Sequence, residues 1–327
     1  MRAVRFTDNR LEVVQLERPS IVPGEVLVRV RMAGICSTDL EITKGYFGFQ
    51  GTLGHEFVGH VVAPESSAWL GKRVVASINF ADPESPGYRD FGFEHHPHRS
   101  VLGILNRDGA MADYVAIPES NLFEIPDTVP DHEAVFAEPL AAALRIPAQL
   151  ESETSGLMKY PEACVVGPGR LGMLIALVLR HHGVNTHVAG RSATSLSLAR
   201  DLDFKTSLAD SLPEQHFHLV VDATGSPTGF ASALRTLRPC GTMVLKSTFA
   251  DAGAIDLTPI VVNEIRIIGS RCGPFDRAIE FLASGALPLS LFIDACYPLE
   301  QALNGFEHAA RPGVRKILLN TTAAEDC

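Results

Sequence analysis

Paired cysteines are absent from this sequence. None of its six cysteines forms a Cys-x-x-Cys pair, and most stand in apolar surroundings. We therefore expect no disulfide framework, and the cysteines suggest a reducing compartment, the cytoplasm. Only the first has neighbours that indicate chemistry. The six are Cys36, Cys164, Cys240, Cys272, Cys296 and Cys327.

Long apolar segments and an excess of positive charge are also absent. The longest nearly continuous apolar run, Leu171–Leu179, is far shorter than the roughly 20 residues of a membrane helix. The N-terminus lacks the apolar region of a signal peptide. The net charge of −10 argues against a nucleic-acid footprint. We therefore expect neither a membrane nor a nucleic-acid partner.

The first part of the chain, to about residue 135, has the pattern of a β-rich domain. The whole chain of 327 residues is long enough for two domains, and a hydrophobic fraction of 46% is ample for their cores. Short alternating runs broken by glycine and proline predict strands. These runs are Leu11–Leu16, Val26–Met32, Phe57–Ala63, Arg73–Ile78 and Tyr114–Ile117.

Between Asn79 and Arg99 the alternation disappears, which predicts a loop or lobe. Three histidines, His95, His96 and His98, stand near its end. No partnering cysteine or spaced acid accompanies them. A solvated histidine-rich loop is therefore expected here, not a metal site.

Residues 162 to 272 alternate between strand and helix patterns, which predicts βαβ units and a parallel sheet. The final stretch, from about residue 274, returns to mixed character. The expected strands are Ala163–Val166, Val184–Ala189, Leu219–Ala223, Met243–Lys246 and Lys316–Asn320, and the expected helices are Met173–His182, Phe275–Ala283 and Leu299–His308.

Three possible metal donors lie close together near the start of the chain. Cys36 is expected in a turn after the strand Glu25–Ala33, and His55 and Glu56 directly precede an alternating run. A thiolate, an imidazole and a carboxylate together suit zinc. The alternative without a metal site is a buried cysteine and a core histidine that are not in contact.

Glu138 stands in a mostly apolar segment, directly before Pro139. Proline fits the first turn of a helix, so Glu138 is expected at the helix entrance. An exposed acid there is favoured by the helix dipole. A buried acid would need a partner or a metal. The residues alone leave both readings open.

A glycine-rich loop between a predicted strand and a predicted helix has the Gly-x-Gly-x-x-Gly spacing of a dinucleotide-binding turn. Gly167 allows the tight turn, Gly169 lets the backbone approach a pyrophosphate, and Gly172 lets helix and strand pack closely. Arg170 and Leu171 complete the loop, whose helix N-terminus offers free N–H groups and partial positive charge.

The end of the second strand predicts which dinucleotide binds. An NAD site usually has an acid there, about 20 residues on. Here Gly190 is followed by Arg191 and Ser192. A guanidinium and a hydroxyl favour a 2′-phosphate, so we predict NADP, with NAD possible. Thr224 and Arg271 are also expected to contact the cofactor.

In their order along the chain, these segments resemble the zinc-dependent medium-chain dehydrogenase/reductase family. The resemblance covers nearly the whole chain. It implies a GroES-like β-rich catalytic domain, residues 1–140 and 274–327, interrupted by a Rossmann domain, residues 141–273. The segments are Gly34–Asp39, Gly54–Gly59, Asp108–Ala110, Glu138–Leu140, Gly167–Gly172 and Asn263–Ile265.

The resemblance also implies roles for individual residues. Cys36 and His55 correspond to catalytic zinc ligands, and Glu138 corresponds to the third ligand of the polyol and sugar dehydrogenase branch. Glu56 resembles the acid that can approach or exchange onto the metal. Asp39 and Thr38 do not bind the metal themselves: Asp39 resembles the carboxylate that orients the ligand histidine, and Thr38 the hydroxyl beside the substrate oxygen.

Two departures from the family pattern matter. The family's structural zinc lobe has four closely spaced cysteines, whose places here are taken by Asp82, Ser85, Tyr88 and His96. We therefore expect one catalytic zinc and no structural zinc, with a lobe that is either held by packing or mobile. Where the family often has a proton-relay histidine, this chain has Glu41, so the proton path to water is left open.

The resemblance implies a zinc-dependent oxidoreductase that transfers a hydride between NADP(H) and an alcohol or polyol, or the matching aldehyde or ketone. A homodimer through Rossmann edge strands is the family default. One alternative is a zinc-free quinone- or enoyl-type reductase, which usually lacks the complete donor set. Another is a non-enzymatic nucleotide sensor, which would have lost Cys36, Thr38, His55 or Glu138.

Overall fold

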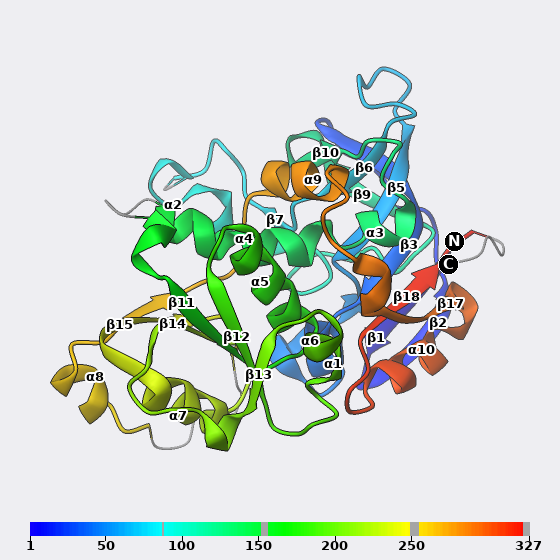
Figure 1. Cartoon of the computed structure of the whole chain (residues 1–327). Helices are drawn as coiled ribbons and strands as arrows, with labels where there is room; N and C mark the ends of the chain where they lie inside the picture. Colours follow the sequence, from blue (N-terminus) through cyan, green and yellow to red (C-terminus); the bar gives the residue numbers. More distant parts are fainter. Residues whose placement is uncertain (87, 152–155, 249–254, 323–327) are drawn as a thin grey trace. The chain divides into compact units, whose positions relative to one another are not determined.

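The structure is a computed structural model that describes residues 1–86, 88–151, 156–248 and 255–322 (Figure 1). The chain separates into two compact units. Unit 1 consists of Met1–Glu138 and Phe275–Cys327, and unit 2 consists of Pro139–Pro274. These bounds lie within two residues of the predicted domain limits.

Unit 1 is built on mostly antiparallel strands, with one parallel pair, β17 and β18, and a few short helices. A seven-stranded sheet has the order β10-β6-β5-β3-β18-β17, with β9 also paired to β3, and a three-stranded sheet has the order β2-β1-β4. The strands are β1 (Arg2–Thr7), β2 (Arg10–Gln15), β3 (Glu25–Ile35), β4 (Gly51–Thr52), β5 (Glu56–Ala63), β6 (Arg73–Ala76), β7 (Asn79–Phe80), β8 (Ser100–Val101), β9 (Tyr114–Pro118), β10 (Leu122–Glu124), β17 (Ile293–Pro298) and β18 (Lys316–Asn320). The helices are α1 (Ser37–Ile42), α2 (Tyr88–His95), α3 (Asp131–Ala134), α9 (Phe275–Ala283) and α10 (Ala302–Ala309).

Strand β3 organises unit 1. It is the longest strand and pairs with β5, β9 and β18. Most of its residues are buried, as its apolar sequence requires. Pairing with β18 returns the end of the chain to the first sheet, in the register Leu318 opposite Gly34. The predicted return of the C-terminal segment therefore has a direct physical basis.

Unit 2 is a six-stranded parallel sheet with the order β13-β12-β11-β14-β15-β16. The strand order reverses at β11, and right-handed crossovers then place α5 and α7 on opposite faces (Figure 1). The strands are β11 (Glu162–Val166), β12 (Asn185–Gly190), β13 (Lys205–Leu208), β14 (Phe217–Asp222), β15 (Leu237–Leu245) and β16 (Arg266–Gly269). The helices are α4 (Ala137–Glu151), α5 (Arg170–His181), α6 (Ser197–Asp201), α7 (Pro227–Thr236) and α8 (Thr258–Val262).

The structure corrects several local predictions. Cys36 does not stand in a simple turn, because it caps the short helix α1. The segment expected as a loop between 79 and 99 contains helix α2. Strand β15 begins at Leu237, ahead of the predicted start at Met243. Within the described residues, no helix is long and apolar enough to cross a membrane.

The cysteines only partly match expectation. Four of them, Cys36, Cys164, Cys240 and Cys272, are free thiols. Cys296 is disulfide-bonded, so the expectation of reduced cysteines is wrong there. Cys327 lies outside the described residues.

Candidate active site

The pairing of β3 with β5 brings the predicted metal donors together. Gly34 is opposite Glu56 in this antiparallel register. Cys36 follows the end of β3, and His55 precedes the start of β5, so both lie at one end of the pair. Ligand atoms of Cys36, His55 and Glu56 all lie within 4.8 Å of one another. Two fragments that could have been unrelated core residues therefore form one cluster.

Asp39 holds both parts of this cluster. One carboxylate oxygen, Oδ2, accepts a hydrogen bond from the backbone N–H of Cys36 at 2.8 Å. The other, Oδ1, lies 3.4 Å from Nδ1 of His55. Asp39 is fully buried and His55 is 3% exposed. A carboxylate on Nδ1 leaves Nε2 of His55 available to a metal.

The charges of the cluster favour a bound cation. Burial alone would lower the pKa of His55. The negative charges of Asp39 and Cys36 raise it by more, so that the pKa lies well above its ordinary value. Asp39 Oδ1 and His55 Nδ1 are buried without a hydrogen-bond partner of good geometry. Buried negative charge next to sulfur, nitrogen and oxygen donors fits Zn²⁺, which is bound by such groups.

Glu56 has a partner that the sequence reasoning missed. Its Oε2 forms a buried ion pair with Nζ of Lys316, the first residue of β18. Their side chains are 1% and 3% exposed. A Cβ atom on Gly34 would lie 2.4 Å from Oε2 of Glu56, so only glycine leaves room for this carboxylate. The sequence feature that could have indicated this partner is a lysine at the start of an apolar strand.

Two tight glycine contacts support the His55 segment. Gly54 has φ of +98°, and a Cβ there would lie 2.7 Å from the backbone nitrogen of Met111. A Cβ on Gly109 would lie 2.3 Å from the carbonyl oxygen of Gly54. Oδ1 of Asp108 accepts a hydrogen bond from the N–H of Thr52 at 2.7 Å. The Asp108–Ala110 motif therefore buttresses the chain that carries His55.

The remaining predicted residues of this site lie close by in sequence or at a helix entrance. Oγ1 of Thr38, in the first turn of α1, lies 3.8 Å from the sulfur of Cys36. Glu138 is the second residue of α4 and is half-buried. It does not belong to the cluster within 4.8 Å. Its role as a third ligand therefore stays a prediction.

In unit 2 the phosphate loop connects β11 to α5 as predicted. Gly167 has φ of +104°, and a Cβ there would lie 2.7 Å from the carbonyl oxygen of Ala223. A Cβ on Gly172 would lie 1.9 Å from the carbonyl oxygen of Gly167. At Gly169 the same atom would meet nothing within 4 Å. The loop is closed toward the protein and open above Gly169, where a pyrophosphate would approach.

Helix α5 begins at Arg170, directly after Gly169, and Leu171 is its second residue. The first free N–H groups of the helix therefore lie at the phosphate loop. Thr224 follows β14, and its N–H and hydroxyl both donate to Oδ1 of Asp222, at 3.0 and 2.7 Å. The carbonyl oxygen of Arg271 accepts a hydrogen bond from Lys246 at 2.6 Å. Parallel pairing places Val166 opposite Asp222, so the phosphate loop and Thr224 both lie at the carboxyl ends of neighbouring strands.

The end of β12 forms a compact turn. Gly190 is buried, and a Cβ there would lie 2.7 Å from Oγ of Ser195. Ser192 and Ser195 each accept a hydrogen bond from the other's backbone N–H at 3.2 Å. Arg191 is exposed next to this turn. A hydroxyl-rich turn beside a guanidinium group fits a phosphate better than a ribose hydroxyl pair.

Hydrogen bonds hold the lobe that the resemblance matches to a structural zinc region. Nε2 of the buried His96 lies 3.0 Å from Oγ of Ser85 and 3.0 Å from the carbonyl oxygen of Pro86. Its Nδ1 accepts from the N–H of His98 at 3.2 Å. Ser85 also donates to the carbonyl oxygen of Asp82 at 2.5 Å. Three of the four cysteine-equivalent positions therefore belong to one hydrogen-bonded cluster.

Comparison with known families agrees with this geometry. Residues 22–127 match the alcohol dehydrogenase GroES-like domain. Residues 171–284 match the zinc-binding dehydrogenase domain. Together the two matches cover the segments that carry both the donor cluster and most of the nucleotide-binding sheet.

Individual proteins are similar over almost their full length. D-arabitol-phosphate dehydrogenase of Enterococcus avium is 27% identical over 97% of this chain and 96% of its own. L-threonine 3-dehydrogenase of Xanthomonas oryzae is 26% identical over 97% and 98%. The crystal structure of a zinc-binding dehydrogenase from Sinorhizobium meliloti, bound to NADP, superimposes with a TM-score of 0.85 and 25% identity over 98% of both chains.

Proposed function

This chain belongs to the zinc-dependent medium-chain dehydrogenase/reductase family, and we propose that it is a zinc enzyme with a preference for NADP(H). It is an NAD(P)-dependent alcohol oxidoreductase. The observation that carries the proposal is the cluster of Cys36, His55 and Glu56, in which the histidine and the glutamate are buried. Its substrate is a small alcohol or polyol, or the matching aldehyde or ketone.

We assign one catalytic zinc ion to Cys36, His55 and Glu138, with Glu56 as the adjacent acid. When bound, zinc supplies a Lewis acid that polarises the substrate oxygen. The ion pair with Lys316 holds the Glu56 side chain beside the ligands. We propose no second, structural zinc ion, and the hydrogen bonds of His96 to Ser85 and Pro86 support this proposal.

The chain's own groups orient the substrate and move its proton. Thr38 lies beside the cysteine ligand, where its hydroxyl can accept the proton of an alcohol or return it to a carbonyl product. Asp39 fixes the ring of His55. The phosphate loop binds the dinucleotide, whose nicotinamide exchanges the hydride with the substrate carbon.

We further propose a sugar-type or polyol substrate. Glu138, which stands where alcohol dehydrogenases of the family have a cysteine, supports the polyol and sugar dehydrogenase branch. D-arabitol-phosphate dehydrogenase, which is similar over nearly the whole chain, has a polyol phosphate in its name. We also propose the cytoplasm as the compartment, because four cysteines are free thiols; Cys296, which is disulfide-bonded, is the exception.

We also propose a homodimer formed through the edge of the unit 2 sheet. Within the described residues β16 pairs only with β15, so its other edge has unpaired backbone groups. Exposed apolar side chains precede this strand in helix α8: Val261 is 76% exposed and Val262 72%. A second copy can pair strand to strand there and cover these side chains.

The cofactor preference can be measured directly in a screen of alcohols and polyols. We expect kcat/KM to be at least about tenfold higher with NADP than with NAD, because the Arg191 guanidinium contacts the 2′-phosphate. Replacing Arg191 by alanine should reduce the ratio about 10- to 100-fold, since a charge-assisted hydrogen bond contributes about 1.5–3 kcal/mol. Arg238→Ala, exposed on the same unit, is the matched control. Equal efficiency with NAD in the unaltered enzyme would refute the preference.

A further inference from the structure

Unit 1 contains a cavity of about 270 Å³ that is separate from the donor cluster. Its lining includes Arg2, Arg18, Arg29, Asp113, Tyr114 and Thr321. Arg29 and Cys36 are seven positions apart along and just beyond β3, so at about 3.3 Å per residue the two sites lie about 23 Å apart. The cavity therefore cannot hold a group that reacts at the zinc site.

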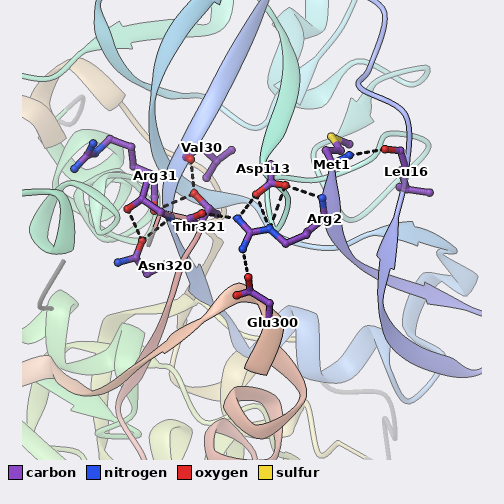
Figure 2. A network of polar contacts seen from close by, with 10 residues as sticks. Met1, Arg2, Leu16, Val30, Arg31, Asp113, Glu300, Asn320 and Thr321 are labelled. Carbon is purple, nitrogen blue, oxygen red and sulfur yellow. Dashed lines mark hydrogen bonds and ion pairs between the residues drawn. The ribbon is translucent and has the colours of Figure 1, made fainter. Parts of the chain in front are cut away.

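Arg2 and Asp113 neutralise each other within this cavity. The Asp113 carboxylate accepts from the guanidinium of Arg2, with Nη2–Oδ1 at 2.6 Å, and from its backbone N–H at 2.6 Å. Arg2 also forms an ion pair with Glu300 and donates to the carbonyl oxygen of Thr321 at 2.6 Å (Figure 2). These contacts use the only carboxylate among the lining residues.

Within the described residues, the other two guanidinium groups of the lining are not paired with a carboxylate. The Arg18 guanidinium lies over the ring of Tyr114, 4.4 Å from its centroid. Arg29 is directly opposite Tyr114 in the β3–β9 register, so its side chain emerges on the same face. Among the described residues, neither arginine forms an ion pair. Glu25, on the same strand, is already bound by Arg107 at 2.5 Å.

A second cavity in unit 1, of about 380 Å³, shows the opposite arrangement. Its arginines, Arg31 and Arg73, both contact Asp131, at 2.5 and 2.9 Å. Its lining also contains Asp127, so the positive charge there is balanced. The smaller cavity therefore differs from the larger one, because two of its arginines, both exposed, have no carboxylate partner among the described residues.

We propose that the cavity around Arg18 and Arg29 binds a phosphate group, either inorganic phosphate or the phosphate of a small ester. Guanidinium groups donate in a fork that matches phosphate oxygens, and Tyr114 fixes one fork by stacking. The bound anion offsets the mutual repulsion of the two arginines. The volume admits a phosphate with a small organic group but not a dinucleotide.

The test is calorimetric titration of the cofactor-saturated enzyme, so that the phosphate loop of unit 2 is already filled. Inorganic phosphate and glycerol 3-phosphate are titrated separately, against chloride of equal ionic strength. The variant R18Q/R29Q removes both free guanidinium groups. The control R10Q/R311Q removes the same charge at two exposed arginines elsewhere on unit 1.

We expect saturable phosphate binding in the unaltered enzyme and the control, and at least about tenfold weaker binding in R18Q/R29Q. The stronger of the two probes identifies the source of the phosphate. The proposal is wrong if the unaltered enzyme shows no saturable heat, if R18Q/R29Q binds as tightly as the unaltered enzyme, or if both variants lose binding equally. Unchanged thermal midpoints show that the variants are folded.

Discussion

At the scale of single residues, the donor cluster depends on contacts between distant parts of the chain. Lys316 and Glu56 are separated by 260 positions, yet they form a buried ion pair. The Cys36 and His55 motifs could be predicted because their spacing and residue types suit zinc. The lysine could not, because its partner is decided by the pairing of β18 with β3, which no local pattern of the sequence reveals.

Replacing Lys316 by methionine should strongly destabilise the enzyme. The variant leaves the Glu56 carboxylate, 1% exposed, without its counter-ion, which typically costs about 3–5 kcal/mol of unfolding free energy. Denaturant unfolding measures this loss. The double variant K316M/E56Q removes both charges and should recover much of the stability. Equal stability of K316M and the unaltered enzyme would show that the pair is not buried as described.

At the scale of elements, strongly periodic segments were predictable and capped or irregular ones were not. Helix α9 and strand β18 have the predicted bounds, because the buried residues of α9 follow a clear helical period and β18 is a short continuous apolar run. Helix α1 is only one and a half turns long and is fixed by the Asp39 contact with Cys36. Helix α2 lies in a weakly apolar lobe that is held by long-range hydrogen bonds of His96.

Removing the His96 side chain should loosen the lobe between 79 and 101. His96→Ala removes the hydrogen bonds to the N–H of His98 and to the carbonyl oxygen of Pro86, at a cost of about 0.5–1.5 kcal/mol for each, because both of these residues are exposed. Limited proteolysis should then cut within the lobe several times faster. His95→Ala, at a mostly exposed neighbour, is the control and should leave the cleavage rate unchanged. Equal protection of both variants would argue against the hydrogen-bonded cluster.

At the scale of the whole molecule, the sheet edge of unit 2 predicts the oligomeric state. Val261→Asp/Val262→Asp places two charges among side chains that are 76% and 72% exposed in the single chain. If a second copy covers them, the unaltered enzyme elutes as a dimer and the variant as a monomer in light-scattering chromatography. Val22→Asp, at a 59% exposed site on unit 1, should remain dimeric. A monomeric unaltered enzyme would rule out this interface.

The two compact units end within two residues of the domain limits that the family resemblance implies, and the change from alternating runs to βαβ units lies near the same place. The division also separates the two tasks of the enzyme. Unit 1 contains the donor cluster, and unit 2 contains the phosphate loop. Damage to one should therefore leave the binding function of the other intact.

The most direct test is the zinc content of the purified enzyme and of Cys36→Ala, measured by elemental analysis together with NADP(H) binding. We predict about one zinc ion per chain in the unaltered enzyme, held by the proposed ligands Cys36, His55 and Glu138. Cys36→Ala should lose the zinc and all turnover but still bind the cofactor through Gly167–Gly172. Retention of full zinc by Cys36→Ala, or full activity of an unaltered enzyme without zinc, would contradict the account.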